Sequence, residues 1–316
     1  MSSAHSVVDG PAVVGLHHVA LAVRDVAAAA RFYKAAVGFE AWAGAQAAGL
    51  PAEGQALCTS NAGLWLLPAA PDARPERRPV NESGLAHLCV QTPQIGAVLE
   101  RFQAEGARLH SPPIDLGTGF LYCYARDPEF NVIEVECVAP VWTQPRPWLA
   151  HANIVTHDLP RLTAFYSGLL EVPAVRSPRW RNDVRLDTIA DLAGVELRAA
   201  WLDAGNAQIE LMQYLSPPTT EISSRREDGV TGFVHLAFEV RDLPQTCARL
   251  LQGGGRLKES PSAYDWQVEG FDPDGNRLLL LDLSAASRRA SRLESLGEPA
   301  ITQRFAAARA ALIATT

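Results

Sequence analysis

The residues best suited to chemistry in this sequence are histidines and glutamates that recur along the chain. Two glutamates, Glu134 and Glu210, lie in runs that alternate apolar and polar side chains, as strands with one buried face do. Histidines occur in further short apolar runs, at His18, His87, His151 and His235. Imidazole nitrogens and carboxylate oxygens together are ligands for Fe, Mn, Ni or Zn. One strand histidine would be ordinary, but histidines at matching places predict a site for one divalent metal ion.

A repeated turn shows that some of these places are equivalent. The stretch 127–136 (DPEFNVIEVE) predicts a tight turn followed by a strand, and 272–280 (DPDGNRLLL) repeats it. Side chains alternate along a strand, so Glu134 and Glu136 share one face. In the later copy, Leu279 stands where Glu134 stands in the earlier one. The copies therefore differ at a residue that matters chemically.

Four segments of the chain share one order of elements. Each begins with a strand that carries one of the histidines, continues as an amphipathic helix, and ends in further strands. The first strands begin near Leu16, Leu85, Leu149 and Phe233. In the first segment, Asp25 is the expected N-cap of a helix that runs to about Val37 and ends at Gly38. The sequence therefore predicts an α+β fold of four tandem β-α-β-β-β units.

Two proline-rich links, 68–82 and 139–147, divide the chain. We place the first pair of units at residues 12–140 and the second pair at 148–284. Residues 285–316 are rich in Ala and Arg and are expected to form a helical tail, which could serve packing or a homodimer contact. A length of 316 residues is enough for two ordinary domains.

Composition excludes several classes of protein. The net charge of −7 and the pI near 5.6 argue against a nucleic-acid binder. We expect no membrane span, because no apolar run is long enough, and no secretory signal in residues 1–10. The five cysteines form no CxxC pair, which favours reduced thiols in a cytoplasmic protein.

The strand histidines and the Asp-Pro-x-x-Asn-x-x-Glu turn resemble the vicinal oxygen chelate superfamily. That superfamily includes glyoxalase I, fosfomycin-resistance proteins, methylmalonyl-CoA epimerase and extradiol ring-cleaving dioxygenases, and the resemblance covers roughly residues 14–284. It implies that two units form one half-open β-cup with its helices outside, so that four units form two cups. Each unit can supply a ligand from its first strand and a carboxylate from its last. Trp65 and Leu279 take the carboxylate position in the first and fourth units.

The sequence leaves open which units share a cup. If they pair in order, the first cup holds His18, His87 and Glu134, a set that resembles the two-His, one-carboxylate triad of extradiol dioxygenases. Tyr124 stands where those dioxygenases keep a tyrosine facing the substrate. Their additional histidine before that tyrosine is missing from residues 115–120.

If the second unit pairs with the third, one cup gains a complete set of ligands, which resembles bacterial glyoxalase I. The set is His87, Glu134, His151 and Glu210. The other cup then has no carboxylate. One intact site and one lost site is the simpler account, and we favour it. His87 and Glu134 are ligands under either pairing.

The resemblance implies a divalent-metal lyase or isomerase of the glyoxalase type, acting on a small oxygenated substrate or its thiol conjugate. Glu134 or Glu210 would move a proton, and Tyr124 would face the substrate. One alternative is an Fe(II) extradiol dioxygenase that opens a catechol-like ring. Another is a non-catalytic protein that sequesters an aromatic ligand, as bleomycin-resistance proteins do, although the carboxylates argue against it.

Two further features carry weaker expectations. The run 176–185 holds four arginines around Trp180 and is interpreted as a solvated loop, with an anion-binding lid as the alternative. His17 follows the alternation of its strand, so we expect it on the opposite face from His18, packed under a helix.

Overall fold

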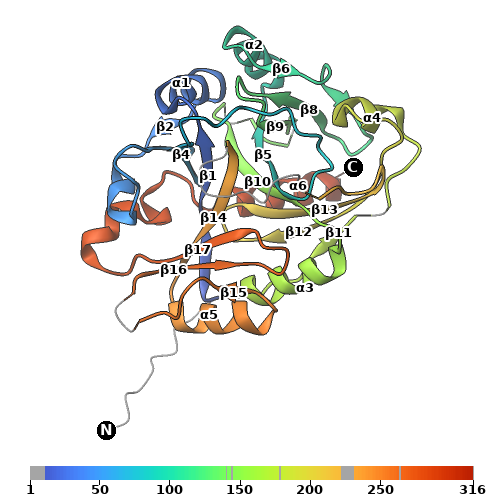
Figure 1. Cartoon of the computed structure of the whole chain (residues 1–316). Coiled ribbons are helices and arrows are strands. Elements are labelled where there is room, and N and C mark those ends of the chain that lie inside the picture. The colour runs from blue at the N-terminus through green and yellow to red at the C-terminus, as the bar shows by residue number, and fades with distance from the viewer. Residues whose placement is uncertain are drawn as a thin grey trace.

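Figure 1 shows the chain as a computed structural model. The structure describes residues 11–139, 141–143, 145–177, 179–221, 231–262 and 265–315. Residues 1–10, where we expected no secretory signal, residue 140, where we place the end of the first pair of units, and residue 316, the end of the tail, lie outside these ranges.

Strand pairing joins the outer two units and the inner two units. In the described part of the chain, the first and fourth units form an eight-stranded sheet with the order β15-β16-β17-β14-β1-β4-β3-β2. Its strands are β1 (Val13–Val23), β2 (Glu40–Ala41), β3 (Gln55–Cys58), β4 (Gly63–Pro68), β14 (Gly232–Val240), β15 (Arg256–Leu257), β16 (Gln267–Phe271) and β17 (Arg277–Asp282). The second and third units form a nine-stranded sheet, β11-β12-β13-β10-β5-β9-β8-β6, with β7 paired to β8. Its strands are β5 (Gly84–Thr92), β6 (Arg108–Leu109), β7 (Ile114–Asp115), β8 (Leu121–Arg126), β9 (Val132–Cys137), β10 (Trp148–Val155), β11 (Val175–Arg176), β12 (Glu196–Asp203) and β13 (Gln208–Ser216).

The first strands of the units lie at the centre of each sheet. Strand β1 pairs antiparallel with β14, and β5 pairs antiparallel with β10. Each first strand is flanked on its other side by the parallel last strand of its own unit. The strands that carry histidines and the strands predicted to carry carboxylates are therefore neighbours.

These sheets confirm the α+β prediction of four tandem units in two half-open cups. The second unit pairs with the third, as we favoured, and the first pairs with the fourth. The alternative of pairing in chain order is wrong. We call the sheet of the second and third units the carboxylate cup, and the sheet of the first and fourth units the filled cup.

The helices lie outside the sheets (Figure 1), and most pack within one half of the chain. The helix at 184–190 instead contacts β7 and β8 of the other half, and the helix at 301–315 packs against Phe120 and Trp148. They are α1 (Val26–Phe32), α2 (Ile95–Ala104), α3 (Leu159–Leu170), α4 (Val184–Ala190), α5 (Leu243–Gln252) and α6 (Ile301–Thr315). Asp25 caps α1 as predicted, and the predicted helix continues as a π-helical turn, Tyr33–Val37, that ends at Gly38 in the left-handed conformation. Next to it, the ring centroids of Phe32 and Phe102, from α1 and α2, lie 5.6 Å apart.

The repeated Asp-Pro turns tie the two units of each half together. The hydroxyl of Tyr33 donates to Asp127 at 2.8 Å, and that of Tyr166 donates to Asp272 at 3.1 Å. Asp127 also accepts from the backbone and side chain of Asn131, which explains the Asp-Pro-x-x-Asn pattern. Because these turns and helices join the two units of each half outside the sheets, the central strands remain available to pair with strands of the other half.

The boundaries of the two pairs of units, 12–140 and 148–284, stay a prediction. Each sheet takes strands from both of these ranges. Residues after 285 form two 3-10 turns, Ala286–Ser291 and Leu293–Ser295, followed by α6. No helix among the described residues is long and apolar enough to cross a membrane.

Candidate metal centre

Four side chains from adjacent strands converge in the carboxylate cup. They are His87 on β5, Glu134 on β9, His151 on β10 and Glu210 on β13. Each offers one ligand atom, and these atoms all lie within 4.8 Å of one another. All four residues are buried. The antiparallel register of β5 and β10 places the two histidines side by side, and the flanking parallel strands add one carboxylate from each unit.

The distances at this centre are those of a compact donor set. His151 Nε2 lies 2.9 Å from Glu134 Oε2 and 3.1 Å from Glu210 Oε2. His87 Nε2 lies 3.3 Å and 3.4 Å from the same two oxygens, and 3.4 Å from His151 Nε2. Ligands held at roughly 2.0–2.2 Å from one tetrahedral ion lie about 3.3–3.5 Å apart. Two nitrogens and two oxygens at this spacing fit a divalent metal ion.

Charge at the centre favours cation binding. Burial would raise the pKa of Glu210, but the charge of His151 and hydrogen bonds with both histidines hold it well below its usual value. Burial likewise opposes ionisation of Glu134, and hydrogen bonds with His151 and His87 lower its pKa. For His87, burial is outweighed by hydrogen bonds to the two glutamates, which raise its pKa. Protons on the histidines thus balance ionised carboxylates, and a divalent ion can take the place of those protons.

The residue two places after each histidine differs between the two units. Asn153 follows His151 and donates from Nδ2 to Glu210 Oε2 at 2.8 Å, while its own buried Oδ1 has no partner among the described residues. Cys89 follows His87 and is fully buried, which raises the pKa of its thiol. Glu210 is therefore anchored by a neutral amide, and Glu134 has no such anchor in the described part of the chain.

A pocket of about 510 Å³ opens from the two carboxylates. Helix α4 covers it with Leu186 and Ile189, and Trp180 and Trp201 line it from the third unit. Trp201 lies opposite Glu210 in the pairing of β12 with β13. A substrate that reaches the centre would therefore lie against aromatic and aliphatic side chains.

Tyr124 faces the centre, where the resemblance placed it. It lies opposite Glu134 in the pairing of β8 with β9, and its ring centroid is 5.0 Å from that of His87. Tyr214 was missed, although it stands four residues after Glu210 on the same strand and thus on the same face. Burial, and then the charge of nearby glutamates, raises the pKa of both tyrosines, so both hydroxyls remain donors. Neither hydroxyl has a hydrogen-bond partner among the described residues, and both line the pocket.

Glu136 was placed on the face of Glu134 but not included in the site. It is buried, lines the pocket, and accepts a hydrogen bond from Gln91 Nε2 at 2.5 Å. Burial and the charge of Glu134 raise its pKa to about 7. The corresponding position in the third unit, two residues after Glu210, holds Met212, so the opposite walls of the pocket differ in polarity.

Among the residues that the structure describes, the filled cup holds no comparable cluster of metal-binding side chains. His18 stacks on Trp65 with ring centroids 3.7 Å apart, and its Nε2 lies 3.0 Å from His235 Nε2. Leu293 and Leu296 from the tail pack into the same apolar cluster. His18 is thus in a different sheet from Glu134, and the triad expected from pairing in chain order does not form. Trp65 and apolar side chains occupy the space that a carboxylate and a substrate would need.

His17 corrects a second expectation. Strand β1 has a register shift between Leu16 and His18, so His17 does not point away from His18. Its Nδ1 lies 2.7 Å from His18 Nδ1, and its Nε2 donates to the carbonyl of Ser291 at 2.7 Å. A carbonyl only accepts, which places the His17 proton on Nε2, the His18 proton on Nδ1, and the His235 proton on Nε2. Three neutral histidines are thus connected by hydrogen bonds in a row that ends at the carbonyl of Ser291 in the tail.

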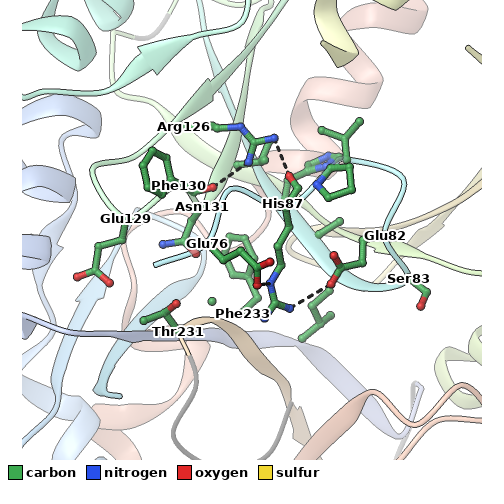
Figure 2. A pocket seen from close by; sticks show the side chains of 17 residues that line it. Glu76, Glu82, Ser83, His87, Arg126, Glu129, Phe130, Asn131, Thr231 and Phe233 are labelled. Carbon is green, nitrogen blue, oxygen red and sulfur yellow. Dashed lines mark hydrogen bonds and ion pairs between the residues drawn. The ribbon is translucent and has the colours of Figure 1, made fainter. Parts of the chain in front are cut away.

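Figure 2 shows a second hollow, of about 550 Å³, between the link 68–82, the Asp-Pro turn and the start of β14. Its charged groups already have partners. Arg126 donates to His110 and to the carbonyls of Phe130 and Arg78, and Arg78 pairs with Glu82. These contacts hold the link against the second unit.

Comparison with known proteins places this architecture in one family. Residues 15–135 and 148–280 match the family model of the Glyoxalase/Bleomycin resistance protein/Dioxygenase superfamily. The chain therefore belongs to this superfamily, which confirms the resemblance found in the sequence. No curated protein sequence matches the chain.

Solved structures show the same fold at low identity. Glyoxalase I from Zea mays is 15% identical, with a TM-score of 0.61 over 85% of this chain and 92% of that one. A putative dioxygenase from Bacillus subtilis is 12% identical, with a TM-score of 0.58 over 92% and 91%. The cppA protein from Streptococcus pneumoniae is 10% identical, with a TM-score of 0.50 over 86% and 100%. At these identities the likeness concerns the fold alone.

Proposed function

We propose that this protein is a divalent-metal-dependent lyase or isomerase of the glyoxalase type. The observation that carries the proposal is the convergence of two imidazoles and two carboxylates at one buried point of the carboxylate cup. In five- or six-coordinate geometry, such a donor set leaves one or two coordination positions for oxygens of a small organic substrate.

His87, Glu134, His151 and Glu210 would hold the ion, and the identity of the metal among Fe, Mn, Ni and Zn stays open. When bound, the ion would supply Lewis-acid polarisation of the substrate's carbonyl oxygen.

Proton transfer would fall to the carboxylates. A carboxylate takes the proton from the carbon beside the carbonyl and returns it to the neighbouring carbon, so the reaction needs no added oxidant or reductant. Asn153 holds Glu210 in place, whereas the two histidines are the only hydrogen-bonding partners that the described residues give Glu134. We therefore assign the mobile base to Glu134. The hydroxyls of Tyr124 and Tyr214 would donate to substrate oxygens at the mouth of the centre.

The test uses the full-length chain reconstituted separately with Mn, Fe, Ni and Zn. The substrate is the hemithioacetal of phenylglyoxal and 2-mercaptoethanol, and the readouts are thioester formation and uptake of deuterium from D2O. At saturating metal, Glu134→Gln should lower turnover by about 10²–10⁴-fold, the usual contribution of a general base. Glu105→Gln, an exposed change at the end of α2, is the matched control. Wild-type turnover in Glu134→Gln would contradict the assignment.

A second candidate is an Fe(II) dioxygenase that opens a catechol-like ring. The aromatic lining of the pocket, with Trp180, Trp201 and Tyr122, favours an aromatic substrate. The fourth protein ligand counts against a dioxygenase, because this ligand fills a coordination position that catechol and O₂ would need. Oxygen uptake by the Fe(II)-loaded protein with catechol separates the two functions: rapid uptake with a yellow product would reverse our ranking.

A further inference from the structure

The pocket beside the candidate metal centre is lined, in the described part of the chain, without a positively charged side chain. Apart from Glu134, Glu136 and Glu210, its lining residues are uncharged, and none of those that the structure describes is Lys, Arg or His. An ionised group taken from water into such a pocket loses its hydration and gains no partner, which costs several kcal/mol or more. The lining therefore disfavours a negatively charged substrate body.

The arginines near the mouth do not change this. Arg179 pairs with Glu196, and Arg185 pairs with Asp183 and donates to the carbonyl of Asp115. None of the arginines in 176–185 is among the residues that line the pocket. Two guanidinium groups of the run that the sequence allowed as an anion-binding lid, those of Arg179 and Arg185, are thus paired with the protein's own carboxylates.

The walls of the pocket suit a flat apolar body. Trp180 and Trp201 stand on the third unit's side, and Tyr122 lies beside Glu136 on the second unit's side. Leu186 and Ile189 from α4 close the apolar part. Aromatic rings prefer offset or edge-to-face contacts with other rings, so such walls bind a ring better than a flexible polar chain.

The charge at the candidate metal centre also disfavours a negatively charged substrate. A divalent ion would be neutralised by Glu134 and Glu210, which leaves Glu136 as the remaining acidic group in the pocket. Gln91 gives Glu136 a hydrogen bond but no positive charge. A carboxylate on the substrate would thus find no positively charged side chain among the described lining residues and an already neutralised centre.

We propose that the substrate is an uncharged aromatic compound with vicinal oxygens, bound with its ring against Trp180 and Trp201, and that the pocket rejects the same headgroup on an anionic body. This inference rests on the proposed function only for the placing of the oxygenated end at the metal centre.

The experiment measures binding to the Mn(II)-loaded full-length chain by titration calorimetry. The probes are 2-hydroxyacetophenone and two derivatives of equal size, its 4-carboxamide and its 4-carboxylate, which differ in charge alone. We expect the carboxamide to bind at least about tenfold more tightly than the carboxylate. Equal or tighter binding of the carboxylate would overturn the proposal, and so would failure of all three probes to bind. Preferential binding without any turnover would reject the proposed reaction and keep the inference.

A positive charge added to the pocket wall tests whether charge is the cause of the binding preference. Met212→Arg should bring the carboxamide-to-carboxylate ratio close to one, because it gives the carboxylate a partner opposite Glu136. Leu251→Arg, on the exposed side of α5, makes the same change away from the pocket and should leave the ratio as in the wild type. Leu116→Lys, at a half-buried lining position, replaces Met212→Arg if circular dichroism shows that the latter fails to fold. An unchanged ratio in a folded pocket variant would show that charge is not what the pocket selects.

Discussion

At the scale of residues, the centre is less symmetrical than its two histidines and two glutamates suggest. The pairs come from equivalent positions of two units, yet Asn153 supports one glutamate and Cys89 stands at the equivalent place in the other unit. The two carboxylates therefore differ in their surroundings, because an amide holds Glu210 and the described residues give Glu134 no amide partner. The same difference continues outward, where Glu136 faces the pocket from one wall and Met212 from the other.

The first prediction concerns the ligands. His87→Ala should weaken metal binding by more than the roughly 10–100-fold that loss of a supporting contact costs, because it removes a donor outright. Glu210→Ala should do the same. His18→Ala, at the equivalent strand position in the filled cup, is the matched control and should keep the wild-type affinity. The measurement is metal titration, with circular dichroism to verify folding. A metal-free His18→Ala beside a fully loaded Glu210→Ala would refute the centre.

The second prediction concerns Tyr214. Replacing it with phenylalanine removes one hydroxyl that faces the carboxylates and leaves the packing of the ring. Turnover should fall by roughly tenfold, the value of one hydrogen bond to substrate, with metal affinity unchanged. Tyr33→Phe removes a hydroxyl that binds Asp127 and should lower stability without changing turnover. Identical kinetics in Tyr214→Phe and the wild type would exclude a role for this hydroxyl.

At the scale of elements, β1 and the tail form one buried polar system in the filled cup. Burial lowers the pKa of His17 to about 4, opposed by its hydrogen bond to Ser291, and burial lowers that of His235 to about 3. Burial, with the neighbouring histidines, also holds the pKa of His18 well below its usual value. The chain of hydrogen bonds needs neutral rings, so acid acts against this contact between strand and tail.

The third prediction gives the sign of that effect. Between pH 6.5 and 4 the unfolded chain binds a proton at His17 and the folded chain does not, so this residue's contribution to stability falls as the pH falls. From pH 7 to 5 the loss is about 2 kcal/mol for this one group. The wild type should therefore lose its stability advantage over His17→Leu as the pH is lowered, measured by urea unfolding of both. His157→Leu, at an exposed histidine, is the control. A difference independent of pH would contradict the shifted pKa.

The sequence predicts the strands, helices and turns of this fold more clearly than it predicts which of them pair with one another. The strand histidines, the caps such as Asp25 and the Asp-Pro turns are local signals, and they identified the units and the four residues of the centre. Which units pair depends on contacts between distant residues, such as Tyr33 with Asp127, and both pairings use the same elements. The register shift in β1 likewise has no local signal, so the position of His17 was mistaken.

At the scale of the whole molecule, the two cups have opposite contents. One holds the candidate metal centre and its pocket, and the other is packed with Leu293 and Leu296 of the tail. Leu293 is buried among Trp42 and Trp65, and its backbone N–H donates to Glu239. The tail segment 286–296 thus belongs to the core of the filled cup, whereas Ile301 and Phe305 of α6 pack against Phe120, Trp142 and Trp148. The homodimer contact considered for the tail stays a prediction.

The fourth prediction tests this packing. Leu293→Ala should lower the free energy of unfolding by about 2–5 kcal/mol, as for other buried leucines. Leu251→Ala, at an exposed leucine, should change it by less than about 0.5 kcal/mol. Urea unfolding measures both, and metal titration should give the same affinity for the two variants. A Leu293→Ala protein as stable as the wild type would mean that the tail does not pack in the filled cup.

Each cup takes one unit from each half of the chain, and this has a consequence for how the two could diverge. In a symmetric dimer of separate halves, every substitution would appear in both cups at once, so loss of a carboxylate would abolish both centres together. Covalent linkage of the halves breaks that symmetry. Trp65 and Leu279 could then replace carboxylates in one cup while Glu134 and Glu210 remained in the other. A single polypeptide can therefore specialise one cup for chemistry and the other for rigidity.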